Sequence, residues 1–236
     1  MLNRKVTNFI RFVLDELLPP ILRDNYYFMY PLFWIWFKGK NVKRFMNFKS
    51  VFHQLSEDDF AGYYRDYEYI ANRDTDLSNQ SIEYIIKQLG NDKNISIVDV
   101  GCGTGYVIKQ IQNEGYSNVC GIDLVPRSEF DSVEIKTGNI ESLPFPDNAF
   151  DVVICSHTLE HVLDLPKAIS ELKRLAKTKL IITVPKQRYY QYTFDLHIHF
   201  FPQISYLLKY IGIDETNVQY KSVSGDWTVV CNTSNL

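Results

Sequence analysis

Five short apolar stretches between residues 95 and 185 alternate with polar or amphipathic stretches. Apolar runs of this length, spaced by helix-length segments, predict a parallel sheet that is covered on both faces. Helices are expected near residues 105–114 and over 164–177, where apolar residues recur at three- and four-residue spacing. The expected strands are residues 95–100, 118–123, 133–138, 150–155 and 179–185.

The end of the chain has a different pattern. Residues 218–223 and 226–231 flank Ser224-Gly225, a pair typical of a tight hairpin turn. The sheet should therefore end in an antiparallel hairpin.

The first third of the chain reads as helical. Helices are expected over residues 3–18, 58–73 and 78–90, with Asp76 or Ser78 as the cap of the last one. We predict a helical, aromatic and basic extension over residues 1–75 and a second domain over 76–236.

Charge is unevenly distributed. Residues 1–50 hold nine Lys/Arg and three Asp/Glu (9 − 3 = +6), and the other 186 residues hold 16 basic and 25 acidic groups (16 − 25 = −9). The basic segment 1–50 either binds an anionic partner or is a helical cap whose charges keep it soluble. The net charge of −3 gives no argument for binding to nucleic acid.

Cysteine usage indicates a reducing, cytoplasmic compartment. The four cysteines are widely separated and form no C-x-x-C pair, so no disulfide is expected. No apolar stretch reaches the ~20 residues of a membrane span, and charges interrupt the start of the chain where a signal peptide would need an apolar core.

Polar residues gather where the predicted strands end. In an open parallel sheet, ligands bind outside the carboxyl ends of the strands. A glycine-rich turn, "DVGCGTGY", ends the first strand, and Asp123 ends the second. Gly138-Asn139 and Ser156-His157 end the third and fourth. These segments are expected to form one site.

The spacing of the turn favours a nucleoside ligand. Asp123 lies 22 positions after Gly101, where a carboxylate holds ribose hydroxyls and repels a 2′-phosphate. Tyr106 stands where a dinucleotide fingerprint needs its third glycine. Asp99 would repel a pyrophosphate but would suit an amino group. S-adenosylmethionine fits this description, because it has an amine, a ribose and an adenine but no phosphate.

The motifs resemble those of class I S-adenosylmethionine-dependent methyltransferases, in the group that includes quinone-biosynthesis enzymes. "VDVGCGTGY", "GIDL" and "GNIESLPFPDNAFDVVICSHTLEHV" carry the resemblance, over residues 78–185. It implies an α/β, Rossmann-like three-layer sandwich with a mostly parallel seven-stranded sheet and a C-terminal antiparallel hairpin. It also implies S-adenosyl-L-methionine as the cofactor.

The resemblance implies a role for each residue of the motifs. Gly101 and Gly103 would pass under the methionine part, Asp99 would hold its amino group, and Asp123 the ribose. Leu124 and Ile140 would contact the adenine. Asn139 would accept from the adenine amine, or else merely cap a turn. The implied cofactor-binding set is Asp99, Gly101, Cys102, Gly103, Asp123, Leu124, Asn139, Ile140 and Ser156.

Two histidine clusters are open to several interpretations. His157, Glu160 and His161 have the H-x-x-E-H spacing of some zinc sites. Because His157 is expected at a strand end, the cluster is interpreted as a structural loop in which His157 projects toward the cofactor's methyl group. Asp195 and His197 alternate with His199 and would share one side of an extended segment.

This second group could hold a metal, act as a general base or support a substrate lid. The expected catalytic residues are His157, His197 and Asp195, and no metal site is assigned.

The predicted function is methyl transfer to a small-molecule, glycan or lipid-linked acceptor. A metal-dependent hydrolase and a non-catalytic nucleoside-binding module remain alternatives. Eight aromatic residues lie in 26–37, and basic residues flank them. Residues 23–44 could touch the inner membrane surface, cover the pocket as a lid, or form a homodimer contact.

Overall fold

The computed structural model describes residues 10, 12–67, 74–127 and 130–235. By its internal contacts the chain divides into two units. Unit 1 consists of Met1–Glu68 with Gln187–Pro202, and unit 2 of Tyr69–Lys186 with Gln203–Leu236.

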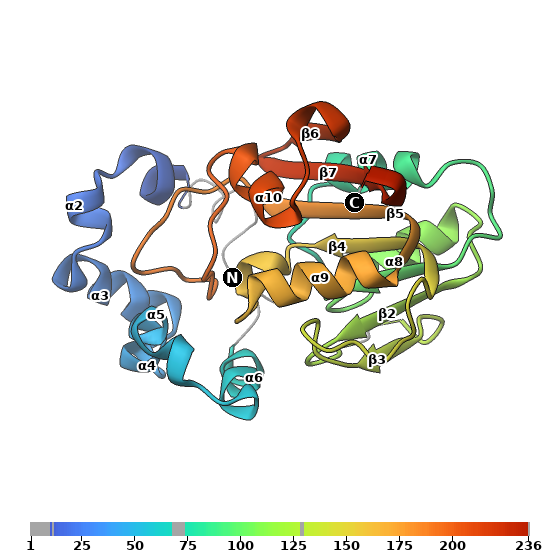
Figure 1. The fold of residues 1–236 in the computed structure, drawn as a ribbon. Coiled ribbons are helices and arrows are strands. Elements are labelled where there is room, and N and C mark those ends of the chain that lie inside the picture. Colours follow the sequence, from blue (N-terminus) through green and yellow to red (C-terminus); the bar gives the residue numbers. More distant parts are fainter. Residues whose placement is uncertain (1–9, 11, 68–73, 128–129, 236) are drawn as a thin grey trace. The chain divides into compact units, whose positions relative to one another are not determined.

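In the described part of unit 2, seven strands form one sheet in the order β3-β2-β1-β4-β5-β7-β6 (Figure 1). The strands β1 to β5 are parallel to one another, whereas β7 is antiparallel to both β5 and β6. The predicted fold class, including the C-terminal antiparallel hairpin, is confirmed. The strands are β1 (Ile97–Val100), β2 (Val119–Asp123), β3 (Ile135–Thr137), β4 (Phe150–Ser156), β5 (Ala176–Pro185), β6 (Gln219–Val223) and β7 (Asp226–Asn232).

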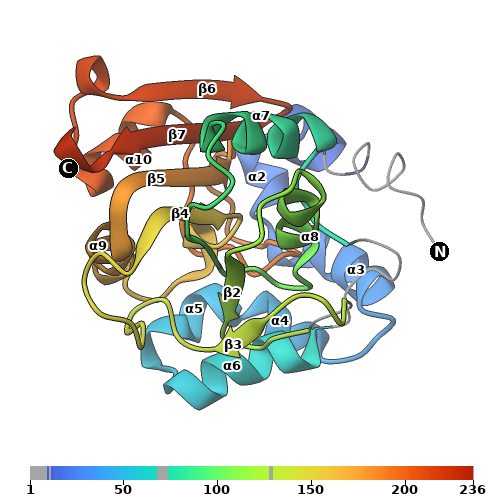
Figure 2. The same ribbon diagram turned by 90° about the vertical axis from the view of Figure 1, so that its right-hand side faces the viewer.

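Helices cover both faces of the sheet. Figure 2 shows α7 (Asn79–Leu89) and α8 (Tyr106–Asn113) on one face, with α9 (Leu165–Leu175) and α10 (Ile204–Ile211) on the other. The central strand β4 is consequently buried on both sides, and Val153, Ile154 and Cys155 are fully buried. This is the physical reason why its sequence is continuously apolar from Val152 to Cys155 rather than alternating.

Local signals set the ends of these elements. The Ser78 side chain accepts a hydrogen bond from Ser81 N and begins α7, so of the two predicted caps Ser78 is the one used. Ser224 and Gly225 have φ angles of +51° and +92°, the left-handed pair that a two-residue hairpin turn requires. The short 3₁₀ helices of unit 2 are η3 (Leu159–His161), η4 (Glu215–Asn217) and η5 (Thr233–Asn235).

Two boundaries and one helix differ from the sequence prediction. The helix α9 ends at Leu175 and β5 already begins at Ala176, before the expected start at 179. The register of β4 with β5 is irregular between Phe150 and Val152. The helix α10 was not predicted, although it buries Ile204, Leu207, Leu208 and Ile211 at helical spacing.

Unit 1 contains short helices. The predicted helix 3–18 lies partly outside the described residues, and its described end is a π-helical turn. Residues 68–73 of the predicted helix 58–73 also lie outside the described residues. The elements are η1 (Val13–Leu17), α2 (Pro20–Arg23), α3 (Tyr26–Trp36), α4 (Val42–Met46), α5 (Phe48–Val51), η2 (Phe52–Gln54) and α6 (Glu57–Asp66).

The helix α3 packs one face against the segment 187–202. Met29 and Phe33 are fully buried, and the Phe33 ring stacks on Phe194 with centroids 4.5 Å apart. Pro31 stands inside α3 without ending it. Because a proline removes one helical hydrogen bond, the buried contacts of this inner face are what hold the helix together.

Within the described residues, no helix combines the length and the apolarity needed to cross a bilayer.

Candidate functional site

The carboxyl ends of three neighbouring strands bring the predicted residues together. Val100 at the end of β1 pairs with Ile122 of β2 on one side and with Cys155 of β4 on the other. Asp99, Asp123 and Ser156 therefore lie at the same edge of the sheet, as the strand-end reasoning predicts.

Two glycines of the first turn differ in what surrounds them. Gly101 has φ +78°, and a Cβ there would overlap the Thr158 side chain, so only glycine fits. Gly103 has φ +54°, and a Cβ there would meet no atom within 4 Å. The main chain at Gly103 thus faces open space, which suits the close approach of a ligand to bare backbone.

Asp123 ties the glycine turn to the end of β2. Its Oδ2 accepts a hydrogen bond from Gly103 N at 2.8 Å, and its Oδ1 accepts one from Val125 N at 2.8 Å. Each carboxylate oxygen can accept a further bond. The carboxylate is therefore held in place with acceptor capacity left for two vicinal hydroxyls.

Asp99 is a buried acid beside this carboxylate. Its exposed fraction is 2%, and burial together with the negative charge of Asp123 raises the pKa of Asp99 to about 7. A ligand ammonium group would offset both effects. The pair of acids thus suits a ligand that carries a cation and a diol, and it disfavours a phosphate.

This pKa predicts a pH dependence of cofactor binding. Asp99 must be ionised to hold an ammonium group, so binding below pH 7 has to release a proton. The affinity for S-adenosylmethionine should fall about tenfold between pH 8 and pH 6, since binding follows the ionised fraction of Asp99. Calorimetry over this range measures it. The Asp99→Asn variant should bind more weakly and lose most of the pH dependence, whereas an equal slope in both proteins would contradict this role of Asp99.

The predicted adenine contacts lie at the ends of β2 and β3. Asn139 Oδ1 accepts a hydrogen bond from Glu141 N at 2.9 Å, so it caps a turn. A carbonyl oxygen has two lone pairs, and the turn does not use up its capacity. Ile140 is buried, whereas Leu124 is half-buried. The adenine role of all three residues stays a prediction.

Cys102 and Ser156 flank this region. The Cys102 side chain packs against β2, since a Cβ on Gly121 would overlap its sulfur, and burial raises the pKa of its thiol. The Ser156 hydroxyl is buried and has no hydrogen-bond partner among the described residues. A buried hydroxyl without a partner is costly unless a ligand or water satisfies it, which fits a bound polar group.

The His157 side chain lies between the carboxylates of Asp226 and Glu160. Its backbone has φ +52°, and its Nε2 lies 3.0 Å from Asp226 Oδ1. Its Nδ1 lies 3.8 Å from Oε1 of Glu160, which is fully buried and makes no hydrogen bond with its carboxyl oxygens in the described structure. His161 Nε2 lies 4.0 Å from the same oxygen.

The charges of this cluster determine its protonation. Burial opposes a charge on His157, but the Asp226 hydrogen bond and the nearby Glu160 and Asp226 carboxylates outweigh it and raise the pKa of His157 to about 9. Burial likewise raises the pKa of Glu160 to about 7, although His157 counteracts it. At neutral pH His157 is an imidazolium, which is a donor and a poor general base.

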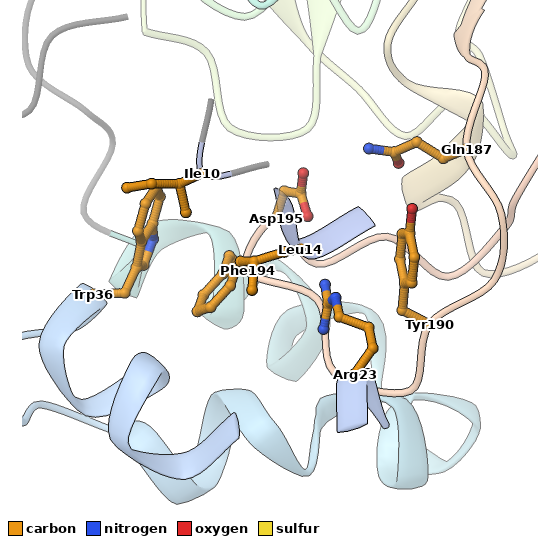
Figure 3. A pocket seen from close by; sticks show the side chains of 8 residues that line it. All are labelled: Ile10, Leu14, Arg23, Trp36, Gln187, Tyr190, Phe194 and Asp195. Atoms are coloured by element: carbon orange, nitrogen blue, oxygen red, sulfur yellow. The ribbon is translucent and has the colours of Figure 1, made fainter. Parts of the chain in front are cut away.

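A pocket in unit 1 is lined by Asp195, another of the predicted residues. Figure 3 shows the polar ends of Arg23, Gln187, Tyr190 and Asp195 turned toward one space, with apolar side chains opposite them. Arg23 is 2% exposed, and its guanidinium lies 4.5 Å from the Tyr190 ring centre. The apolar lining is Ile10, Leu14, Trp36 and Phe194.

Asp195 and His197 are brought together by an irregular backbone. Leu196 has φ +57°, so the segment is not extended as the alternation assumed. His197 is buried; its Nδ1 lies 2.7 Å from Gln187 Oε1, and its Nε2 lies 3.7 Å from Asp195 Oδ2. An amide oxygen only accepts, so the Gln187 contact indicates a proton on Nδ1 and leaves Nε2 as the ring nitrogen that faces Asp195. His199 is half-buried.

Sequence reasoning missed several members of both clusters. Asp226 lies 69 positions after its partner His157, and nothing in its local sequence marks it. Lys49 donates to Tyr190 O, and burial, with a smaller effect of the Arg23 charge, lowers its pKa to about 7 despite Asp195. From the sequence, the basic residues of 1–50 were interpreted only as a charged surface. The aromatic residues that lie near Arg23 and Lys49 in the sequence were the signal that could have singled out these two.

Comparison with known proteins agrees with this geometry. A family model described as a methyltransferase domain matches residues 98–182. An uncharacterized protein of Methanocaldococcus jannaschii is 33% identical over 140 residues, which cover 58% of this chain and 60% of that protein. The malonyl-[acyl-carrier protein] O-methyltransferase of Serratia marcescens is 33% identical over 87 residues, 34% of each chain. The matched part of the chain thus spans less than two thirds of the length of these relatives.

A solved structure shares the fold. The crystal structure of a SAM-dependent methyltransferase from Aquifex aeolicus superposes with a TM-score of 0.51 at 18% identity, covering 76% of this chain and 99% of that one. The matched family model, the strand order of the sheet and the acids at the strand ends all favour a methyltransferase fold. Residues 98–182 of this chain match a methyltransferase domain and share the fold of a SAM-dependent methyltransferase, and these similarities support S-adenosylmethionine as the cofactor.

Proposed function

We propose that the chain transfers the methyl group of S-adenosylmethionine to a small-molecule, glycan or lipid-linked acceptor. The observation that carries the proposal is the Asp123 carboxylate, which two backbone N–H groups hold beside the open main chain of Gly103. When bound, the cofactor supplies an electrophilic methyl group on a sulfonium. Alignment of the acceptor's nucleophilic atom with that methyl group then provides most of the rate.

We assign the general base, where the acceptor needs one, to His197 rather than His157. His157 is charged at neutral pH because two carboxylates face it, whereas in His197 the Gln187 contact places a proton on Nδ1 and leaves Nε2 as the nitrogen that we assign to proton uptake. Asp195 lies on the side of that nitrogen and would stabilise the imidazolium after proton uptake. His157 then acts as a positioning residue at the end of β4.

The pocket of unit 1 is the proposed acceptor site. Its cavity of about 20 Å³ has room for a small group only, so we assign it to a polar or charged group of the acceptor, which Arg23, Gln187, Tyr190 and Asp195 would bind. Membrane contact through residues 23–44 and a homodimer are further predictions from the sequence.

A labelling experiment tests the proposed activity. The full chain is incubated with methyl-tritiated S-adenosylmethionine and with fractions of water-soluble and lipid extracts, and the labelled product is analysed by mass spectrometry. Label in one fraction supports methyl transfer. Normal cofactor binding without label in any fraction would favour the non-catalytic nucleoside-binding module. A chelator-sensitive hydrolysis of ester or phosphate substrates would favour the hydrolase.

Replacing Arg23 tests the acceptor pocket. The Arg23→Leu variant should raise the KM for the labelled acceptor about tenfold, the size of one charge-assisted hydrogen bond, and leave the Kd for S-adenosylmethionine unchanged. Lys209→Leu, at an exposed lysine of α10, is the matched control. An unchanged KM in Arg23→Leu would place the acceptor elsewhere.

A further inference from the structure

The helix α3 is apolar on its outer face as well as on its inner one. Tyr27, Trp34 and Ile35 are 85%, 55% and 67% exposed, and with Pro31 they follow helical spacing on the side opposite the buried Met29 and Phe33. A helix that is apolar all round normally has a partner on every side. Here the described chain covers only one side.

The preceding elements extend this face. Leu17 is 63% exposed and Ile21, on α2, is 79% exposed. Of the eleven large hydrophobic side chains that are exposed in the described structure, eight lie between residues 12 and 35: Phe12, Leu17, Ile21, Leu22, Tyr27, Phe28, Trp34 and Ile35. We call these eight side chains the outer apolar face; α2 and α3 are the neighbouring blue helices of Figure 1.

Positive charge lies directly beside this face. Residues 25–37 hold no charged residue, and Lys38, Lys40 and Lys43 follow them, all exposed. Residues 25–56 contain no aspartate or glutamate at all. From α3 to residue 56 the surface therefore combines aromatic and aliphatic side chains with cations and no acidic residue, whereas Asp15, Glu16 and Asp24 precede α3.

We propose that the outer apolar face docks in the interface of an anionic membrane. Tyr and Trp prefer the headgroup level, aliphatic side chains bury just below it, and lysines pair with anionic lipids. The eleven residues of α3 span about 16 Å at 1.5 Å per residue, too short for a ~30 Å hydrocarbon core, so the helix lies in the plane of the interface.

A second copy of the chain fits this surface less well. A symmetric dimer brings the same patch from both copies together, so one interface would collect Lys38, Lys40 and Lys43 of both copies, and residues 25–56 offer no acidic side chain to pair with them. Anionic headgroups neutralise these charges instead. The charge pattern is what favours a membrane as the occupant.

Vesicle flotation of the full chain tests the proposal. The protein should float with vesicles of phosphatidylcholine and phosphatidylglycerol at low salt, bind much less to pure phosphatidylcholine, and be partly released by 0.5 M salt. The double variant Trp34→Ser/Ile35→Ser should reduce the bound fraction about tenfold. Lys38→Glu/Lys43→Glu should remove the preference for anionic vesicles.

A matched control separates this face from general hydrophobicity. Tyr206 and Tyr210 on α10 of unit 2 are 52% and 46% exposed. The variant Tyr206→Ser/Tyr210→Ser therefore also removes two large exposed hydrophobic side chains, and it should bind vesicles like the wild type. Circular dichroism and calorimetry with S-adenosylmethionine verify that each variant is folded.

Two outcomes would overturn the proposal. One is that the protein does not float with anionic vesicles at low salt. The other is sedimentation that shows a dimer which only the Trp34→Ser/Ile35→Ser variant loses, without vesicle binding, which would assign the face to self-association. Because vesicle binding is measured without an acceptor, either result leaves the proposed methyl transfer untouched.

Discussion

Replacing Asp123 with alanine is expected to weaken the binding of S-adenosylmethionine by about 5- to 150-fold, or ~1–3 kcal/mol. The substitution removes the carboxylate that we assign to the ribose hydroxyls. It also releases Gly103 N and Val125 N, which both donate to that carboxylate, so the glycine turn loses its link to β2. Isothermal calorimetry with the cofactor and with its demethylated product measures the change.

Two further variants separate these contributions. Asp123→Asn keeps one acceptor oxygen and removes the charge, so it should fall between the wild type and the alanine variant. Asp131→Ala removes an exposed carboxylate a few residues away and should leave the affinity unchanged. An affinity of Asp123→Ala equal to that of the wild type would show that Asp123 does not hold the ribose.

Much of the sheet could be predicted from the sequence because its strands are buried on both faces. Continuous apolar runs such as residues 152–155 are typical of strands buried on both faces, and each predicted strand is present within three residues at either end. The position of Asp123 beside the glycine turn followed from the same logic, since parallel strands end at one edge.

Contacts between distant positions could not be predicted. The pairing of His157 with Asp226 depends on β7 inserting between β5 and β6, which no local pattern encodes. The same holds for the segment 187–202, which packs with the first 68 residues through contacts such as Phe33 with Phe194. In α3, the sequence showed an aromatic stretch with a proline, and only the buried inner face explains why it is helical.

The His157 cluster predicts that the protein becomes less stable as the pH rises. The folded-state pKa of His157 is about 9, above the ordinary value of 6.5. Its stabilising effect is therefore complete below pH 6.5 and is lost as the pH rises through 9. The difference of roughly 2.5 pH units corresponds to about 3 kcal/mol of the free energy of unfolding. Glu160, whose pKa is raised to about 7, acts in the same direction at lower pH, since folding disfavours its ionised form.

Urea unfolding of the wild type and of His157→Gln between pH 6.5 and 9.5 measures this effect. The free energy of unfolding should fall with pH in the wild type, and the difference between the two proteins should shrink by about 3 kcal/mol across the range. The buried cysteines also favour lower pH, but they are common to both proteins and cancel in the difference. The exposed His53, replaced by glutamine, is the matched control and should leave the slope unchanged. A difference that is constant with pH would mean that His157 is neutral in the folded protein, and it would return His157 to the candidates for the general base.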